Sequence, residues 1–495
     1  MALFKKLIPY ILVILLSSFS ILSFFHSGFF PMHDDTQVQR VYEMAKSLKM
    51  GMFPVRWVAD LGYGLGYPIF NFYAPLAYYF GAKFVLLGFD ALVSTKIMII
   101  FGVLLSSFSM YLLAREFWGK KGGIISALLY VFFPYHAVNI YVRGAISELW
   151  AYAFIPLAFF GFYKLFKNNK YIYVIISVIG FSGVILSHNL TAMMITPFLI
   201  VLLIILGILN LKHKKNKNTF YLISAFFLSI LISAFYWLPA ILEMGNTNVS
   251  STIGGGADFK DHFVCLDQLW YSYWGFGGST KTCSDGLSFM LGKLNILIVV
   301  FSMIFLIISL MLGKEIDKKT KYLCIVLFSG LIFSIFLMLS QSKIIWELIS
   351  PMKYFQYPWR YLNMVGFFSA FLGGSIIVFS RQFIKNKNII FVEFLITILL
   401  IVLVNFKFFH PREILNKTAN DYINDYSLRW TTSKISDEYL PKNVKKPKNA
   451  EEALKNKPIF VFIDTPIEKI GNSISLAGIL IVVLGIIFTR KKKNK

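Results

Sequence analysis

Long apolar runs alternate with short basic clusters along the whole chain. The apolar runs recur at a length of roughly twenty residues, which is what a helix needs to cross the hydrocarbon core of a bilayer. Lysine and arginine gather between the runs, and such basic loops usually face the cytoplasm. Placing every basic cluster inside predicts both termini inside and twelve crossings: 7–25, 92–114, 122–138, 148–166, 170–187, 191–211, 218–240, 291–313, 320–340, 360–380, 388–408 and 473–489. The pattern therefore predicts an all-α polytopic membrane protein.

Residues 72–89 are also apolar enough to span, but counting them would invert every later basic cluster. We therefore expect an amphipathic or re-entrant helix at the outer interface, where aromatic residues are favoured. The expected long outer loops are 26–91, 243–290, 341–359 and 409–472. The expected domains are a transmembrane part (1–408), a small extracytoplasmic segment (409–472) with a strand at Ile459–Ile463, and a last helix with a basic tail (473–495).

Composition and charge support a membrane protein. Hydrophobic residues make up 57% of the chain and charged residues only 15%, against roughly 25% charged in soluble domains. The net charge of +24 would suggest nucleic acid in a soluble protein. In a membrane protein the basic loops explain this charge. We therefore expect the lipid bilayer as a partner and no nucleic acid. The chain has no GxSxG, HExxH or Walker sequence, which argues against the common hydrolase, zinc and NTPase classes.

Asp34 and Asp35 follow the first apolar segment directly. Carboxylates at the mouth of a membrane helix are costly unless they have a task. One of them could take a proton from an acceptor hydroxyl, or the pair could bind a divalent cation. The alternative is structural: Asp35 or Thr36 would cap a helix over 36–50, with Asp34 beside its dipole. The residues alone leave these alternatives open.

Further polar residues are expected at outer helix ends, and each has a structural alternative. Arg143 and Arg360 could hold a phosphate, or could pair internally. Glu148 begins a predicted helix, whose dipole favours a carboxylate there. His188 could act chemically, although a lone histidine at a helix end more often caps or packs. Glu243 ends another predicted span.

Two cysteines fall in one expected outer loop. Cys265 and Cys283 lie 18 residues apart, where oxidation is allowed, and we expect a disulfide between them.

Several stretches resemble known membrane families. They are HDDTQVQR (33–40), FPVRWVADLGYGLGYPIFNFYAPLAYYF (53–80), PYHAVNIYVRGAISE (134–148), LSHNL (186–190), YWLPAILE (236–243), FQYPWRYL (355–362) and TTSKISDEYLP (431–441). In this order they resemble the membrane family labelled 6-pyruvoyl-tetrahydropterin synthase related, close to the YfhO-like proteins. The acidic pair after the first helix, with an amphipathic first loop, resembles the GT-C glycosyltransferase architecture.

The GT-C resemblance implies an enzyme that uses a polyprenyl-phosphate-linked sugar donor at the outer face of the plasma membrane. The acceptor would be a cell-envelope glycan, lipid or protein. By this resemblance Asp34 or Asp35 is the base or a metal ligand, and Arg143 and Arg360 hold the donor phosphate. We prefer Asp34 as the base, because it lies nearer the end of the first helix and Asp35 is the better cap for the next one. Glu148, His188 and Glu243 are further candidates for binding the substrate. Two other functions remain open: a transporter of a lipid-linked substrate, and a non-catalytic assembly or regulatory protein.

Overall fold

A computed structural model describes residues 2–252, 257–458 and 463–491. Within these residues the chain is helical, and its β-pairing is limited to isolated bridges such as Phe29–Leu415. The all-α membrane fold class is thereby confirmed. Residues 459–462 of the expected strand lie outside the described residues.

The chain forms two compact units that interleave in sequence. Unit 1 comprises Met1–Phe25, Gly102–Arg143 and Ile253–Glu413. Unit 2 comprises His26–Phe101, Gly144–Thr252 and Ile414–Lys495.

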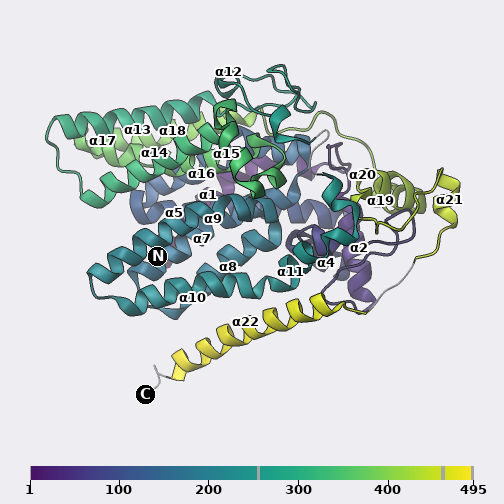
Figure 1. Ribbon diagram of the computed structural model, residues 1–495. Helices are drawn as coiled ribbons and strands as arrows, with labels where there is room; N and C mark the ends of the chain where they lie inside the picture. The colour runs from purple at the N-terminus through teal and green to yellow at the C-terminus, as the bar shows by residue number, and fades with distance from the viewer. Residues whose placement is uncertain (1, 253–256, 459–462, 492–495) are drawn as a thin grey trace. The chain divides into compact units, whose positions relative to one another are not determined.

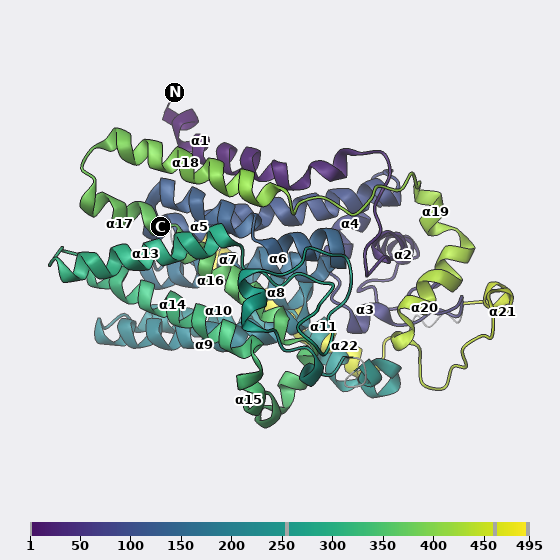
Figure 2. The same cartoon turned by 90° about the horizontal axis from the view of Figure 1, so that it is seen from above.

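Unit 1 is mainly a bundle of long apolar helices (Figure 1). Its helices are α1 (Ala2–Ser17), η1 (Ser18–Phe25), the later part of α5 (Ala91–Val131), α6 (Pro134–Ala137), η2 (Val138–Arg143), η5 (Phe259–Asp261), α12 (Leu266–Trp270), α13 (Lys293–Met311), α14 (Lys318–Met338), η6 (Ser340–Ser342), α15 (Lys343–Leu348), η7 (Ser350–Phe355), η8 (Pro358–Tyr361), α16 (Leu362–Gly373), α17 (Ile376–Phe383) and α18 (Lys387–Phe406). Helices α13, α14, α16 and α17 pack together, as Figure 2 shows.

Unit 2 joins a second set of apolar helices to a group of short polar ones. Its helices are α2 (Gln37–Lys49), α3 (Ile69–Phe72), α4 (Leu76–Leu86), the first part of α5, α7 (Ile146–Lys167), α8 (Tyr171–Ser187), α9 (Asn189–Lys212), α10 (Asn216–Ile232), α11 (Ala234–Leu242), η3 (Met244–Asn246), η4 (Asn248–Thr252), α19 (Ala419–Ile423), η9 (Ser427–Thr432), α20 (Ser433–Ile435), η10 (Asp437–Tyr439), α21 (Ala450–Lys455) and α22 (Pro466–Lys491). Helix α22 runs beside α10 and α11 (Figure 1), and α2 packs against α4 and α19.

Nine helices in the described part of the chain are long and apolar enough to cross a membrane. They are Lys6–Phe25, Ala91–Val131, Ile146–Lys167, Asn189–Lys212, Lys293–Met311, Lys318–Met338, Pro358–Phe383, Lys387–Phe406 and Pro466–Thr489. A tenth arises if α10 and α11, bent by 62°, count as one broken span. With this broken span included, two of the twelve expected crossings, 122–138 and 170–187, are missing from the set. Helices nevertheless lie at both positions.

The first difference lies in α5, where Gly119 separates two helical arms. Its φ of 69° and ψ of −175° are not helical. A Cβ added at Gly123 would lie 3.0 Å from the Cα of Arg115. The arms therefore fold back on each other around this break, as expected for separate crossings at 92–114 and 122–138.

The second difference is α8, which has 17 residues and falls just below the length of a standard span. It packs closely on α7, because a Cβ at Gly180 would lie 2.5 Å from the backbone nitrogen of Ala158. Small residues allow such close approach between membrane helices.

The apolar stretch 72–89 does not form a long helix. Helix α4 has 11 residues, well short of the roughly 20 that a crossing needs. Its buried side, including Tyr78 and Ala82, faces other helices of unit 2.

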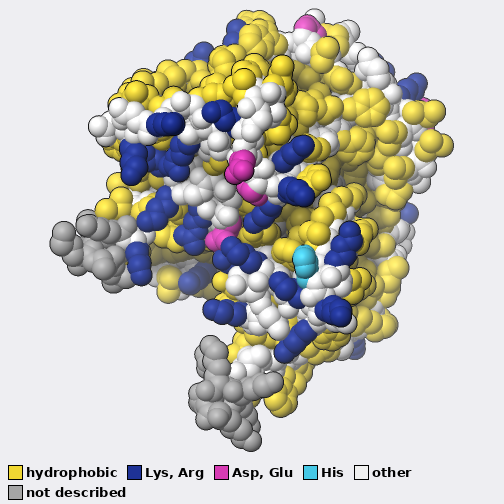
Figure 3. All heavy atoms as spheres, turned by 90° about the vertical axis from the view of Figure 1, so that its left-hand side faces the viewer, with side chains coloured by type: hydrophobic (Ala, Val, Ile, Leu, Met, Phe, Trp, Pro, Cys, Tyr) yellow, Lys and Arg dark blue, Asp and Glu magenta, His cyan; other side chains and the backbone are white. Residues whose placement is uncertain are grey.

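Basic residues gather at one end of the unit 2 helices. Short connections make α7, α8, α9 and α10 antiparallel neighbours, with lysines at the α7–α8 and α9–α10 turns. His188 and Glu243 therefore lie at the opposite helix ends. Figure 3 looks onto the side toward which the α9–α10 turn points, and Lys and Arg cluster there.

Impermeant thiol labelling should locate the basic turns. In a background without native cysteines, Lys120→Cys and Lys215→Cys should not react in intact cells, because basic loops stay inside. Lys442→Cys, which is exposed in the expected outer segment, should react. Labelling of the first two variants before lysis would show that the topology is inverted.

Cys265 and Cys283 are joined by a disulfide with Cα atoms 5.8 Å apart. That separation lies in the usual range for disulfides. Gln268 holds the same loop, since its Nε2 donates to the carbonyl of Cys283 (3.0 Å) and to Oδ2 of Asp285 (2.7 Å).

Candidate functional site

The predicted site residues are divided between the two units. Asp34, Asp35, Glu148, His188 and Glu243 belong to unit 2. Arg143 and Arg360 belong to unit 1. The acidic candidates are therefore described here within unit 2 and the two arginines within unit 1.

Asp34 and Asp35 form the turn that leads into α2. Thr36 occupies the N-cap position, but no side chain caps the helix. In the described residues neither carboxylate has a hydrogen-bond or ion-pair partner. The capping alternative for Asp35 and Thr36 is therefore wrong in this structure, and both carboxylates remain available.

The backbone around the pair is held firmly. Gln37 Nε2 donates to the carbonyl of Asp34 (3.1 Å) and to that of Gly144 (2.8 Å). Its Oε1 accepts a hydrogen bond from the Tyr78 hydroxyl (2.6 Å). A fixed main chain with unbonded carboxylates is suited to a group that acts on a bound molecule.

Burial changes the acidity of Asp35. Loss of water around its carboxylate raises the pKa to about 6, although Lys417 opposes the rise. A base with a pKa near the working pH is efficient in proton transfer. At pH 7 Asp35 is therefore mostly ionised and ready to accept a proton.

Arg40 lies one turn into α2 and is almost completely buried, with 4% of its surface exposed. Its guanidinium lies over the Tyr73 ring, 4.1 Å from the centroid. Within the described residues, Nε and Nη1 have no hydrogen-bond partner. Burial alone would lower the pKa of Arg40. The neighbouring Tyr73, Tyr78, Tyr439 and Asp34 together outweigh this effect and keep the pKa well above its usual range. A buried cation with unused donors is suited to an anionic group.

Glu43 is the other buried charge-bearing residue of α2. Burial and the adjacent Asp60 carboxylate raise the pKa of Glu43 above its usual range. Its Oε2 accepts a hydrogen bond from the backbone nitrogen of Asp60 (3.1 Å), and Lys46 pairs with the Asp60 carboxylate. This trio fixes the end of α2 against the segment that follows it.

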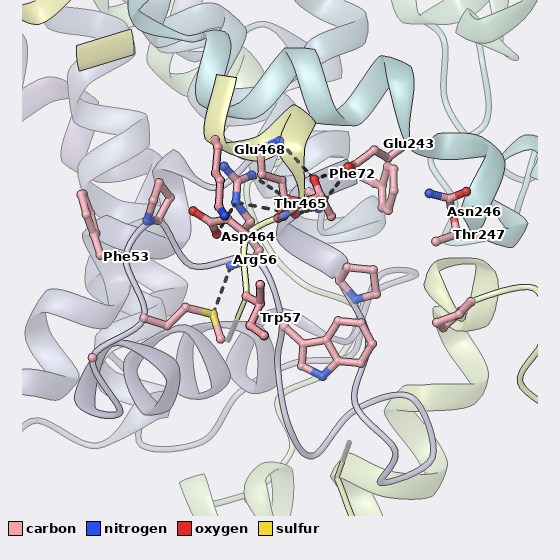
Figure 4. Close-up of a pocket in the computed structure, with 18 residues that line it drawn as sticks. Phe53, Arg56, Trp57, Phe72, Glu243, Asn246, Thr247, Asp464, Thr465 and Glu468 are labelled. Carbon is pink, nitrogen blue, oxygen red and sulfur yellow. Dashed lines mark hydrogen bonds and ion pairs between the residues drawn. The ribbon is translucent and has the colours of Figure 1, made fainter. Parts of the chain in front are cut away.

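Glu243 lines a cavity of about 580 Å³ in unit 2 (Figure 4). Arg56 organises one side of it: Nη1 donates to Asn71 Oδ1 (2.7 Å) and Nη2 to Asn472 Oδ1 (2.7 Å). Asn71 Nδ2 in turn donates to Glu468 Oε1 (2.6 Å). Burial raises the pKa of Glu243, whose Oε1 accepts a hydrogen bond from the Thr465 hydroxyl.

Arg143 and Arg360 lie beside neighbouring aromatic residues of unit 1. The Arg143 guanidinium lies 4.7 Å from the centre of the Trp359 ring and donates to the Tyr135 hydroxyl (2.8 Å). Arg360 donates to the carbonyl of Phe355 (2.8 Å) and lies 5.1 Å from the centre of the Tyr357 ring. Both arginines already have structural partners.

Glu148 and His188 lie where the structural roles considered for them require: one at the start of a helix, the other as a helix cap. Glu148 is buried in the first turn of α7. His188 is the N-cap of α9, and its Nδ1 accepts a hydrogen bond from the Thr191 backbone nitrogen (3.2 Å).

In the part of the chain that the structure describes, no three His, Cys, Asp or Glu side chains are grouped as metal ligands.

Sequence reasoning missed Arg40, Arg56 and Glu468. Arg40 and Arg56 lie within stretches that carry the family resemblance, HDDTQVQR and FPVRW, but nothing in the sequence alone singles them out. Glu468 is the acidic residue of the first turn of α22.

Comparison with known proteins supports the fold. Residues 70–254 match the family described as "6-pyruvoyl-tetrahydropterin synthase related domain; membrane protein". An uncharacterised protein of Lactococcus lactis subsp. cremoris is 26% identical over 286 residues, which cover 54% of this chain and 46% of the relative. The chain thus spans less than half the length of that curated relative.

Two solved structures are also similar. Arabinofuranosyltransferase AftD from Mycobacteria matches 83% of this chain with a TM-score of 0.51 and 13% identity, over 28% of its own length. ArnT from Cupriavidus metallidurans, bound to undecaprenyl phosphate, matches 75% of this chain and 78% of its own with a TM-score of 0.34 and 10% identity. Residues 70–254 are therefore similar to the 6-pyruvoyl-tetrahydropterin synthase related membrane domain, and the fold of the chain is similar to that of the arabinofuranosyltransferase structure.

Proposed function

We propose that this chain is a GT-C-type glycosyltransferase of the plasma membrane. It transfers a sugar from a polyprenyl-phosphate-linked donor to a glycan, lipid or protein acceptor at the outer face. The observation that carries the proposal is the Asp35 carboxylate, which is partly buried, unbonded and shifted in pKa to about 6, close in sequence to the buried Arg40. The fold shared with an arabinofuranosyltransferase is consistent with this chemistry, although fold alone does not fix function.

The reaction needs a base and a cation. Asp35 accepts the proton of the acceptor hydroxyl, whose oxygen then bonds to the anomeric carbon of the donor sugar. The bond from that carbon to the phosphate oxygen breaks, and the electron pair leaves with the polyprenyl phosphate. Arg40 stabilises the negative charge on the departing phosphate, and this stabilisation is strongest in a site screened from water. Asp34 is adjacent to Asp35 in the sequence, and its charge acts on Arg40.

The pH dependence of transfer tests the base. Asp35 must be ionised, so activity should fall about tenfold per pH unit below about pH 6, where the carboxylate becomes protonated. The measurement is transfer of radiolabelled sugar from the lipid fraction to the acceptor fraction of membranes carrying the full chain. The residual activity of Asp35→Asn should not show this acidic limb. If Asp35→Asn keeps the same acidic limb in its pH profile, the group that titrates is not Asp35.

A further inference from the structure

Neither Asp35 nor Arg40 lines the cavity that contains Glu243. Its volume of about 580 Å³ lies within the roughly 300–1,000 Å³ of typical small-molecule sites. Figure 4 shows Arg56, Asp464, Thr465 and Glu468 gathered on one side, with Asn246 and Thr247 on another. The cavity is thus lined by polar side chains that come from distant parts of unit 2.

The lining offers both donors and acceptors of hydrogen bonds. Glu243, Asp464 and Glu468 provide carboxylate oxygens, which accept strong hydrogen bonds from hydroxyl groups. Asn71 and Asn246 add amide groups, which donate and accept. A ligand with many hydroxyls satisfies such a surface better than an apolar one.

The charges disfavour an anion. The cationic side chains are Arg56 and Lys469, against the three carboxylates. Arg56 is also committed, because its Nη atoms bond to amide and carbonyl oxygens. Its remaining Nε lies 3.7 Å from Glu468 Oε1 and 3.8 Å from Asp464 Oδ1. A phosphate or uronate would therefore meet more negative charge than free positive charge.

Aromatic rings complete the wall. Phe53 lines the cavity and 79% of its surface is exposed, so its ring is open to a bound molecule. Trp57 and Phe72 line it as well. Aromatic faces carry negative charge density and attract the positive edge of C–H groups, such as those on one face of a pyranose ring.

We propose that this cavity binds an uncharged saccharide, which is the acceptor glycan of the transfer reaction. The assignment as acceptor rests on the proposed function, whereas binding of the saccharide does not. The carboxylates and amides form hydrogen bonds with the hydroxyl groups of the sugar, and Phe53 and Trp57 pack against its apolar face.

Binding is tested with the purified full chain in detergent on an array of neutral oligosaccharides, with phosphorylated and uronate-containing oligosaccharides as comparators. Wild type should retain neutral oligosaccharides at least tenfold more tightly than the anionic ones. Glu243→Gln removes a charged acceptor and should weaken binding about tenfold. Phe53→Ala, whose side chain is exposed and whose loss leaves the fold intact, should weaken it severalfold.

Tyr426→Ala is the matched control, because Tyr426 is an exposed aromatic residue of unit 2 outside the cavity lining. It should bind like wild type. Retention of no neutral oligosaccharide, a preference for anionic ones, or wild-type binding by both Glu243→Gln and Phe53→Ala would overturn the proposal. Saccharide binding by a chain that transfers no sugar would instead refute the proposed function and leave the cavity assignment standing.

Discussion

Asp35→Asn is expected to lower sugar transfer by about 10² or more at equal membrane abundance. The substitution keeps the volume of the side chain and removes its ability to accept a proton. Because the Asp35 carboxylate has no structural partner in the described residues, the protein level should hold. The measurement is transfer of labelled sugar in membranes, normalised to the amount of chain.

Two comparisons make this result specific. Asp34→Asn should have the smaller effect, since Asp34 acts through the charge it places near Arg40. Asp425→Asn alters an exposed carboxylate of unit 2 and should leave transfer unchanged. Wild-type transfer in both Asp34→Asn and Asp35→Asn would refute the catalytic role and favour a non-catalytic membrane protein.

Arg40→Met should separate catalysis from stability. Methionine keeps an unbranched apolar stem against Tyr73 but removes the cation, so kcat/KM should fall by about 10²–10³. A buried charge without full hydrogen bonding is costly, and an apolar replacement of similar size is often neutral or stabilising. We therefore expect an unchanged or higher apparent Tm in detergent together with the loss of transfer.

A structural arginine should behave in the opposite way. Arg429 donates to the carbonyls of Leu454 and Asn456, so Arg429→Met should lower the apparent Tm with little effect on the transfer rate of the folded protein. If Arg40→Met lowers the apparent Tm and leaves kcat/KM unchanged, Arg40 serves the fold alone.

The helices could be predicted from local patterns, because the length of an apolar run and the basic clusters at its ends depend only on neighbouring residues. The helix expected at 36–50 is found at Gln37–Lys49. Gly119 divides the long helical segment α5 into two arms, and these arms overlap the crossings expected at 92–114 and 122–138.

The site could be predicted only in part. Nothing local distinguishes Arg40 from an exposed helix arginine, since its burial depends on Tyr73 and on Tyr439, almost 400 residues later. Glu243 was selected as a helix-end carboxylate, but its cavity requires Asp464 and Glu468 from the far end of the chain. His188 shows the reverse case, where a local pattern offered both a cap and a catalyst and the structure supplies the cap.

Mass spectrometry of lipid-linked sugars and envelope glycans tests the central claim most directly, because it can detect the transferred sugar whatever its identity. Cells would carry the wild-type chain, no chain, or Asp35→Asn at wild-type abundance. The account predicts that the last two lose the same sugar from an envelope glycan, lipid or protein and accumulate the same polyprenyl-phosphate-linked sugar. Identical profiles in all three strains, or a wild-type profile with Asp35→Asn, would contradict it.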